Sequence, residues 1–424
     1  MPKIVYAKDI TAKELVSARN ADYADVEETV KAIIADVRAR GDEALIDYAR
    51  RFDKAEIPAL KVSEEEISRA MERAGADYIR ILERAADNIE RYHRAELRSD
   101  FELKYDGITA GQLFLPLESA GIYVPGGTAR YPSSVLMNAI PARIAGVKNI
   151  VMTTPPASDG SIPDNILAAA RVAGVTAIYK TGGAQAVAAL AYGTESVPKV
   201  DKITGPGNVY VATAKKLVQG EVGIDMIAGP SEILVVADGG ADPDWIAADL
   251  LSQAEHDKMA TAILITDDRT FAEKVSEAID TRIKTLPRRE IASASLERNG
   301  KIVLTESIRE AVELSNELAP EHLELAVANA DELLPYVRNA GSVFLGYYTP
   351  EATGDYMAGA NHTLPTGGTA RFSSALGVDD FIKKTQYIRF TPESIDTYAD
   401  DIAAFATSEG LDAHAASVMA RRSK

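Results

Sequence analysis

From Gly121 to Leu345, short runs rich in β-branched residues alternate with stretches whose apolar residues repeat at helical spacing. This alternation constrains the fold strongly, because strands joined through helices form parallel sheets that need helices on both faces. We expect strands at 121–125, 149–153, 177–180, 232–236, 261–265, 301–304, 323–327 and 341–345, with helices that include 133–146, 164–173, 184–192 and 208–218. The predicted fold class is α/β, with two related Rossmann-like parallel-sheet domains.

The two ends of the chain differ from this central region. Residues 25–98 are highly charged and carry apolar residues at helical spacing, so we expect helices there. Residues 1–20 are expected to form a short N-terminal arm, and residues 377–424 a small helical C-terminal domain. His93 lies among charged residues, and we expect it at the solvated surface.

One segment is repeated within the chain. Gly126–Leu136 recurs as Gly367–Leu376, with Pro132 as the one insertion. A Gly-Gly turn leading into a Ser-capped helix would account for both copies. We favour two related α/β modules, each with a glycine-rich loop that enters a helix, because the match is long for coincidence.

Composition excludes several kinds of chemistry. The 424 residues include no cysteine, which rules out disulfides, thiolate metal sites and a cysteine nucleophile. The formal net charge of −17 disfavours nucleic acids and anionic membranes as partners. The N-terminus has no apolar signal-like region and no run reaches transmembrane length, so we expect a cytoplasmic protein of two to four domains.

Glycine-rich turns follow or flank several of the expected strands. They lie at 125–127, 181–185, 204–208 and 228–232. In an open α/β sheet such turns gather at the carboxyl ends of the strands, where ligands bind and backbone N–H groups suit phosphates. None of them has the G-x-G-x-x-G spacing of the usual dinucleotide fingerprint. The turns therefore indicate a ligand-binding crevice without naming its ligand.

A helix that begins at Asp242 and Pro243 is expected to end near Gln253 and His256. These two residues are three apart, so they point to the same side and an amide oxygen and an imidazole converge. Such a pair suits a borderline metal such as zinc. The alternative is a solvated helix end with a His favoured by the helix dipole.

Other candidate residues lie on loops. Glu321 and His322 follow Pro320, which ends a helix, and they combine a carboxylate with a proton acceptor near neutrality. A capped turn with two solvated polar groups is the alternative. Further carboxylates and imidazoles occur at Asp355, His362, Glu409 and His414.

With these motifs assembled, the chain resembles the histidinol dehydrogenase family over nearly its whole length. The motifs Ser252-Gln253-Ala254-Glu255-His256, Ala319-Pro320-Glu321-His322-Leu323, Gly354-Asp355-Tyr356 and Asn361-His362 occur in the family's order, between Gly121–Gly127 and the tail from Glu409 to His414. The resemblance implies NAD-dependent, four-electron oxidation of L-histidinol to L-histidine through L-histidinal. It also implies one zinc per site and a homodimer with shared active sites.

The resemblance assigns roles to individual residues. Glu321 and His322 correspond to an acid–base pair, and His362 matches a position near the substrate. The zinc ligands would be Gln253, His256, Asp355 and His414, the last from the partner subunit. The substrate would be contacted by Ser231, Gln253, His256, His322, Asp355, Glu409 and His414. NAD would be contacted by Tyr123, Gln185 and Asn208. We expect residues 21–122 with 233–376 to form a first α/β domain with the metal and acid–base motifs, 123–232 a second on the NAD side, and 377–424 to contribute to the partner's site.

The missing cysteine bears on the second oxidation. Many aldehyde dehydrogenases add a thiolate to the aldehyde, whereas here water would have to add, with Glu321 activating it after His322 has taken the alcohol proton. Zinc would mainly position the substrate. Three alternatives stay open: a related zinc and NAD dehydrogenase of another small alcohol, a zinc hydrolase, and a non-catalytic ligand-binding protein.

Overall fold

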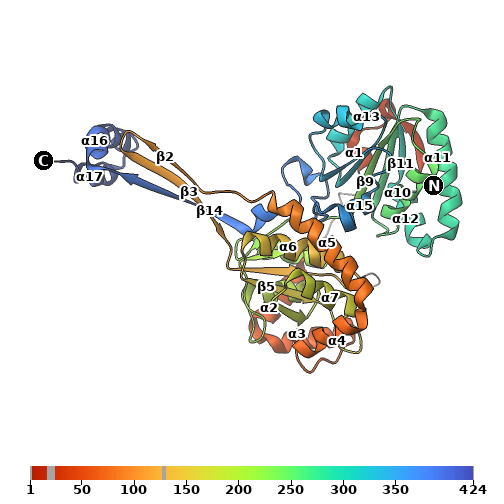
Figure 1. The fold of residues 1–424 in the computed structure, drawn as a ribbon, viewed down its shortest axis with the longest axis horizontal. Helices are drawn as coiled ribbons and strands as arrows, with labels where there is room; N and C mark the ends of the chain where they lie inside the picture. Colours follow the sequence, from red (N-terminus) through yellow and green to blue (C-terminus); the bar gives the residue numbers. More distant parts are fainter. Residues whose placement is uncertain (1, 17–23, 127–129, 424) are drawn as a thin grey trace.

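A computed structural model describes residues 2–16, 24–126 and 130–423 of the chain. Two helix-covered sheets form the bulk of the molecule, and a narrow arm that carries the C-terminus projects away from them (Figure 1). All eight strands expected from the alternating pattern are present, with ends within two residues of the expected ones. The α/β fold class is therefore confirmed.

The first sheet has six parallel strands, in the order β1-β11-β10-β9-β12-β13. Its central strand β9 is buried along its whole length, as expected for a strand covered on both faces. The expected N-terminal arm is anchored, because β1 pairs with β11 at the edge. The strands are β1 (Lys3–Tyr6), β9 (Glu232–Ala237), β10 (Thr261–Thr266), β11 (Lys301–Leu304), β12 (His322–Ala326) and β13 (Ser342–Leu345).

Two groups of helices cover the faces of this sheet. Helices α10, α11 and α12 share a core with one face, whereas α1, α13 and α14 share a core with the other. Helix α10 begins as expected, since Asp242 caps it and Pro243 occupies its first turn. These helices are α1 (Ala12–Leu15), α10 (Pro243–Ala254), α11 (Arg269–Arg282), α12 (Arg289–Asn299), α13 (Ile308–Leu318), α14 (Ala330–Leu333) and, after β13, α15 (Glu351–Thr353).

The second sheet has five parallel strands, in the order β6-β5-β4-β7-β8. They are β4 (Ser119–Tyr123), β5 (Asn149–Thr154), β6 (Ala177–Lys180), β7 (Lys202–Thr204) and β8 (Gly223–Ile224). Helices α6 (Pro132–Ala145) and α7 (Asp164–Ala173) cover one face, and α8 (Gly183–Tyr192) and α9 (Val209–Val218) cover the other.

The N-terminal helices differ from our expectation in where they pack. We placed residues 21–122 with the first sheet, but α4 and α5 share a core with α6 and α7, and α2 and α3 share one with α8 and α9. Apolar periodicity reveals which face of a helix is buried and not which sheet covers that face. These helices are α2 (Ala24–Arg40), α3 (Asp42–Tyr48), α4 (Glu64–Ala74) and α5 (Ala76–Arg94).

The two sheets share one topology. With β1 set aside, each has the order third, second, first, fourth, fifth along the chain, which is the order of a doubly wound fold without its sixth strand. The repeated segment does not produce this shared topology. The first copy leads into helix α6, whereas the second copy contains only the short 3-10 turn Thr369–Arg371. Residues 127–129 of that first copy lie outside the described residues.

The arm contains strands as well as the expected helices. Three antiparallel strands, β2 (Phe101–Tyr105), β3 (Ile108–Pro116) and β14 (Ile382–Phe390), lead to α16 (Pro392–Ser408) and α17 (Asp412–Met419). We expected residues 377–424 to form a small helical domain and did not expect β14. Strand β14 is largely exposed and polar, so it lacks the apolar run that marks a buried strand.

His93 is not at the surface, as we expected, but is completely buried. Its Nδ1 lies 2.7 Å from Glu96 Oε2, and its Nε2 lies 3.4 Å from the amide nitrogen of Asn361. The charged neighbours of His93 along α5 gave no sign of the loop at 359–366, which packs on this helix and on α6. None of the helices in the described ranges combines the length and apolarity that a membrane span requires.

Candidate active site

The acid–base pair lies at the amino ends of β9 and β12, together with three of the four metal candidates, Gln253, His256 and Asp355. Helix α10 follows β9 and runs back along the sheet, so its last turn returns to this edge. The turn at 228–232 also lies here, before β9, whereas we expected it at a carboxyl end; the other three glycine-rich turns do follow β4, β6 and β7. A turn between two domains can precede a strand as well as follow one. The spacing of its glycines in the sequence does not distinguish the two cases.

His322 opens β12 and Glu321 lies immediately before it, and both are buried. The Nδ1 of His322 lies 2.9 Å from the backbone oxygen of Glu232, so Nδ1 carries the proton and donates it. The backbone N–H of Glu232 in turn donates to Glu321 Oε2 at 2.9 Å. One residue of β9, Glu232, thus orients both side chains through its backbone N–H and C=O, and Nε2 of His322 is left to accept a proton.

Burial changes the protonation of both groups. It lowers the pKa of His322 to about 4, so the ring is neutral near pH 7. It raises the pKa of Glu321 well above the usual value for a glutamate, and the nearby charges of Glu232 and Asp355 act in the same direction. A neutral imidazole and a carboxyl group of high proton affinity are suited to proton transfer.

A second group of side chains could hold a cation. Atoms of His322, Glu351 and Asp355 lie within 4.8 Å of one another. One end of the Gln253 amide, at the end of α10, lies 2.8 and 3.0 Å from the two oxygens of Glu351. Assigned from these partners, that end is the NH2 group, which donates to both oxygens. In the described part of the chain, no Lys or Arg forms an ion pair with Glu351 or Asp355. Buried oxygen and nitrogen donors of this kind fit zinc.

Asp355 lies in a π-helical turn, Gly354–Ala358, directly after α15. Its Oδ1 is 3.6 Å from Nδ1 of His362. Burial tends to raise the pKa of Asp355, but the imidazoles of His362, His322 and His256 stabilise its charge and bring the pKa below the usual value. Asp355 therefore shares one electrostatic cluster with the acid–base pair. His256 is exposed and acts on Asp355 through its charge, but it lies outside the group of atoms within 4.8 Å of one another.

The loop after Asp355 joins this cluster to the second sheet. The ring of His362 lies 3.4 Å from the hydroxyl of Ser134 on α6. Asn361 donates to the backbone oxygen of Met137, and Asn138 donates to Thr363. The amino edge of the first sheet is thereby tied to a helix of the second.

Not every expected residue reaches the cluster. Ser231 lies there, immediately before β9, but Glu409 ends α16 and His414 lies on α17, both exposed. These two helices form the tip of the arm, far from β12 in the same chain (Figure 1).

Glu351 belongs to the cluster and was missed from the sequence. It lies in Tyr348-Thr349-Pro350-Glu351, where nothing in the spacing marks it. A carboxylate four residues before Asp355 in a helical stretch was the one available signal.

The NAD candidates lie on the second sheet. Tyr123 ends β4, Gln185 is in the first turn of α8, and Asn208 caps α9. The Tyr123 hydroxyl accepts the N–H of Gly183 at 3.1 Å. Three buried threonine hydroxyls at the carboxyl ends of β5, β6 and β7 have no hydrogen-bond partner within the described residues; they belong to Thr153, Thr181 and Thr204. Polar atoms of this kind indicate a site that a ligand or water completes.

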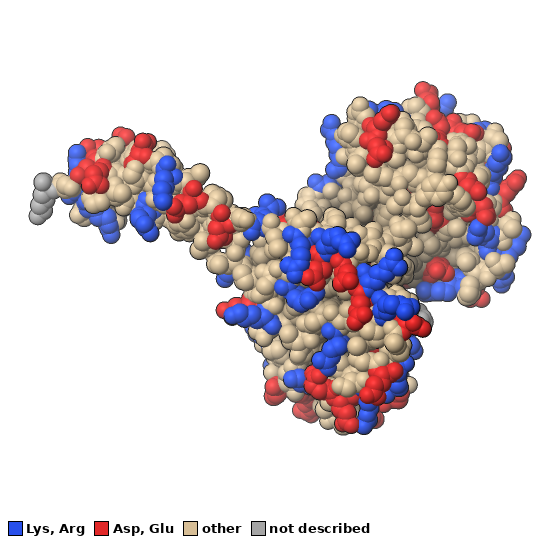
Figure 2. Space-filling model, viewed as in Figure 1, with Lys and Arg blue, Asp and Glu red and all other residues tan. Residues whose placement is uncertain are grey.

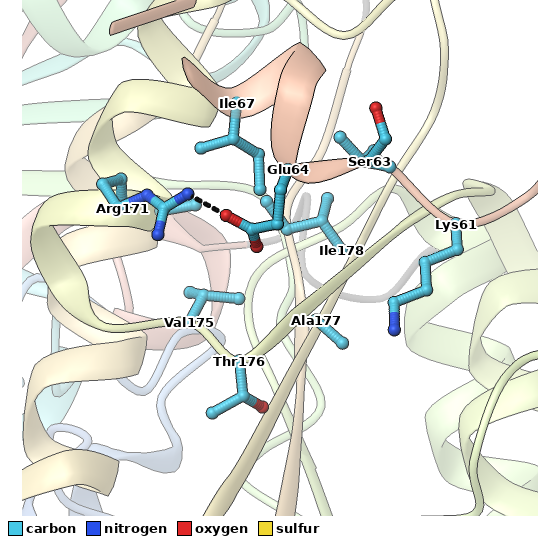
Figure 3. A pocket seen from close by; sticks show the side chains of 11 residues that line it. Lys61, Ser63, Glu64, Ile67, Arg171, Val175, Thr176, Ala177 and Ile178 are labelled. Carbon is cyan, nitrogen blue, oxygen red and sulfur yellow. Dashed lines mark hydrogen bonds and ion pairs between the residues drawn. The ribbon is translucent and has the colours of Figure 1, made fainter.

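A separate cavity of about 370 Å³ lies between the start of α4 and the end of α7 (Figure 3). Two of its charged side chains pair with each other, since Arg171 binds Glu64. It contains none of the expected site residues. Over the visible face of the molecule, acidic and basic side chains are interspersed (Figure 2).

Comparison with known proteins covers almost the whole chain. A sequence model described as histidinol dehydrogenase matches residues 16–422. The chain belongs to the histidinol dehydrogenase family. It is 55% identical over 401 residues to the histidinol dehydrogenase of Geobacter sulfurreducens, which covers 94% of this chain and 93% of that protein. It is 54% identical over 413 residues to the enzyme of Geobacillus kaustophilus, with coverage of 96% and 97%.

Solved structures agree with this family membership. The crystal structure of histidinol dehydrogenase from Elizabethkingia anophelis matches 99% of this chain and 98% of its own, with a TM-score of 0.94 and 39% identity. The expected family is therefore confirmed, and the protein is an oxidoreductase of the histidinol dehydrogenase family.

Proposed function

We propose that the protein oxidises L-histidinol to L-histidine through L-histidinal, with one water consumed and two NAD reduced. The observation that carries this proposal is the pairing of His322 with Glu321. A neutral imidazole with a free Nε2 stands beside a buried carboxyl group, and both are oriented by the backbone of one β9 residue, Glu232. Family membership supplies the substrate class.

Zinc fits the donor set of the cluster. We propose Gln253, His256 and Asp355 as ligands, completed by the partner subunit's His414. The same residues, with Ser231, His322 and Glu409, would contact the substrate. Zinc would supply orientation, by holding the imidazole and amine of histidinol.

In the first oxidation, we assign the base to His322. Its Nε2 accepts the proton of the substrate hydroxyl, while the Nδ1–H bond to Glu232 stabilises the resulting imidazolium. NAD, when bound, accepts the hydride from the substrate carbon. The proton then leaves His322 for solvent, which the low proton affinity of this buried ring favours.

In the second oxidation, we assign the activation of water to Glu321. Burial strengthens its carboxylate as a base, so it can take a proton from the water that adds to the aldehyde. His322 then takes a proton from the resulting hydrate. In a chain without cysteine, this route needs no covalent intermediate.

We propose that NAD binds at the carboxyl edge of the second sheet. Tyr123, Gln185 and Asn208 lie beside the switch point between β4 and β7, where the strand order reverses. The unpaired hydroxyls of Thr153, Thr181 and Thr204 face the same edge and fit a polar ligand.

We also propose a homodimer with shared sites. Large apolar side chains on the arm are about half exposed or more, which is unusual for a surface without a partner; they include Phe101, Leu103, Tyr105, Ile388 and Phe405. His414 lies on the same arm, so a partner's arm could deliver it. A cytoplasmic location stays a prediction.

The test measures NADH from L-histidinol with metal-stripped and zinc-restored protein side by side. We expect two NADH per histidinol, lost on stripping and recovered with zinc. Glu321→Gln should slow the second NADH more than the first, and His322→Asn should lower kcat about 10²-fold or more. Equal slowing of both steps by Glu321→Gln would contradict its assigned role, and turnover without NAD would contradict the reaction itself.

A further inference from the structure

Glu351 occupies an unusual position beside the cluster. Its side chain is only about 5% exposed, yet Pro350 and α15 place its carboxylate among other acidic groups. The backbone N–H of Glu351 donates to Glu324 Oε1 at 2.7 Å, which fixes the start of this short helix. The carboxylate itself is therefore held in place by its own backbone and points toward the end of α10.

The carboxylate has two neighbours there. One end of the Gln253 amide lies 2.8 and 3.0 Å from the two oxygens of Glu351. Both contacts are N–H···O hydrogen bonds when the NH2 group faces the Glu351 oxygens, and the amide oxygen then points the other way. The second neighbour is His322, whose Nε2 lies 3.6 Å from Glu351 Oε1, too far for a strong hydrogen bond.

We propose that Glu351 is a positioning residue that sets the direction of the Gln253 amide, so that its oxygen is presented to the metal. The inference rests on the proposed function, because it takes Gln253 as a zinc ligand. A glutamine amide has an oxygen and a nitrogen of nearly the same size, and only its hydrogen bonds decide which end faces the ligand. An NH2 group cannot coordinate zinc, so a reversed amide would remove one ligand.

Glu351 also restricts the reversed orientation. With the amide turned round, its oxygen would face the same two Glu351 oxygens, and both N–H···O hydrogen bonds would be lost. Outer partners of metal ligands typically change metal affinity about 10- to 100-fold when removed. We assign Glu351 to these outer partners, although its carboxylate also lies within 4.8 Å of His322 and Asp355, because both of its oxygens are engaged by the Gln253 amide. We expect an effect of that size from its removal.

The test compares zinc dissociation constants, measured by competition with a chromophoric chelator, for four proteins. These are the wild type, Glu351→Gln, Gln253→Glu and the double swap. Glu351→Gln should weaken zinc binding about 10-fold or more, because its own amide cannot accept with both atoms. In the double swap, the new amide can donate to the new carboxylate, so zinc should bind at least about 10-fold more tightly than the two single effects predict.

Glu255→Gln is the matched control. Glu255 lies two residues from Gln253 and is partly exposed. Its substitution by Gln removes the same unit of charge as Glu351→Gln without changing a contact of the Gln253 amide. Its zinc affinity should stay within about 3-fold of the wild type. Equal losses in Glu351→Gln and Glu255→Gln would show a general charge effect and overturn the inference, as would full affinity in Glu351→Gln.

Two further measurements keep the outcomes distinct. Thermal unfolding of the metal-free proteins tests whether the variants fold. If Glu351→Gln has a lowered melting temperature, Glu351→Asp replaces it in the comparison. Its shortened side chain should lower zinc affinity without lowering the melting temperature. Unchanged affinity in that variant overturns the inference. A wild-type protein that binds no zinc contradicts the proposed function, whereas zinc binding that is indifferent to residue 351 contradicts only the positioning role.

Discussion

Asp53 shows how a single buried carboxylate can work against stability. Its Oδ2 is buried and, among the described residues, has no hydrogen-bond partner. Burial raises the pKa of Asp53 to about 6 from an ordinary value of 3.8. In the unfolded chain the group ionises freely near pH 4, whereas in the folded chain it holds its proton to about pH 6.

We predict that Asp53→Asn becomes progressively more stable than the wild type as pH rises from 4 to 7. The folded wild type binds more protons in this window, so its free energy of unfolding falls with rising pH, and the variant lacks this loss. Since the side chain is partly exposed, the gain in free energy of unfolding should be about 1 kcal/mol, which is less than the full pKa shift would give. Urea denaturation at pH 4.5 and 7.5 measures the difference in free energy of unfolding between variant and wild type. For Asp401→Asn, at an exposed position, this difference should not grow between the two pH values.

At the scale of elements, one buried ion pair joins the ends of β7, α9 and β8. Lys215 on α9 pairs with Asp225, and both side chains are at most 2% exposed. Lys215 Nζ also donates to the backbone oxygen of Gly205, while Gly205 N–H donates to Asp225. Gly205 has a φ of +113°, and a Cβ there would lie 2.1 Å from the backbone oxygen of Tyr123. This network holds the turn that leads to Asn208.

We predict that Lys215→Met destabilises the protein by about 3–5 kcal/mol, because it leaves the Asp225 charge buried and unpaired. Adding Asp225→Asn should recover part of this loss, since the neutral amide keeps an acceptor for Gly205. Chemical denaturation gives the free energies, and the KM for NAD should rise in the single variant.

The neighbouring Lys216 provides the comparison. It is exposed and pairs with Glu27 at 3.4 Å, so Lys216→Met should cost at most about 1 kcal/mol. Similar effects of the two lysine variants would contradict the importance of the buried pair.

At the scale of the whole molecule, the arm separates two sets of expected ligands. Gln253 and His256 lie at the sheet edge, whereas His414 lies at the tip of the arm (Figure 1). In the proposed dimer, each site combines residues of both chains. Two variants that are inactive alone should therefore complement each other when mixed as subunits.

We predict that co-expression of His256→Asn with His414→Asn restores about one quarter of wild-type activity, because half of the dimers are mixed and each mixed dimer has one intact site. The control co-expresses His256→Asn with Gln253→Ala. Both residues belong to the sheet-edge half of a site, so every site of a mixed dimer carries one defect. That mixture should stay inactive. Recovery in the control, or none in the test pair, would argue against a shared site.

Much of this architecture follows from local patterns in the chain. The eight expected strands were correct because each is a short apolar run between turn residues, which a strand buried on both faces requires. The start of α10 was correct because Asp242 and Pro243 supply a cap and a first turn by themselves. The motifs around Gln253, His256, Glu321 and His322 pointed to the family, which the comparisons confirm.

Other features depend on contacts between distant segments. The burial of His93 depends on Asn361, the role of Glu351 depends on Gln253, and β14 forms only because β3 lies beside it. Local sequence determines which conformation a segment prefers and which of its faces is apolar. Only the tertiary structure decides what meets that face, because the free energy of a contact depends on both partners, and the second partner can lie hundreds of residues away.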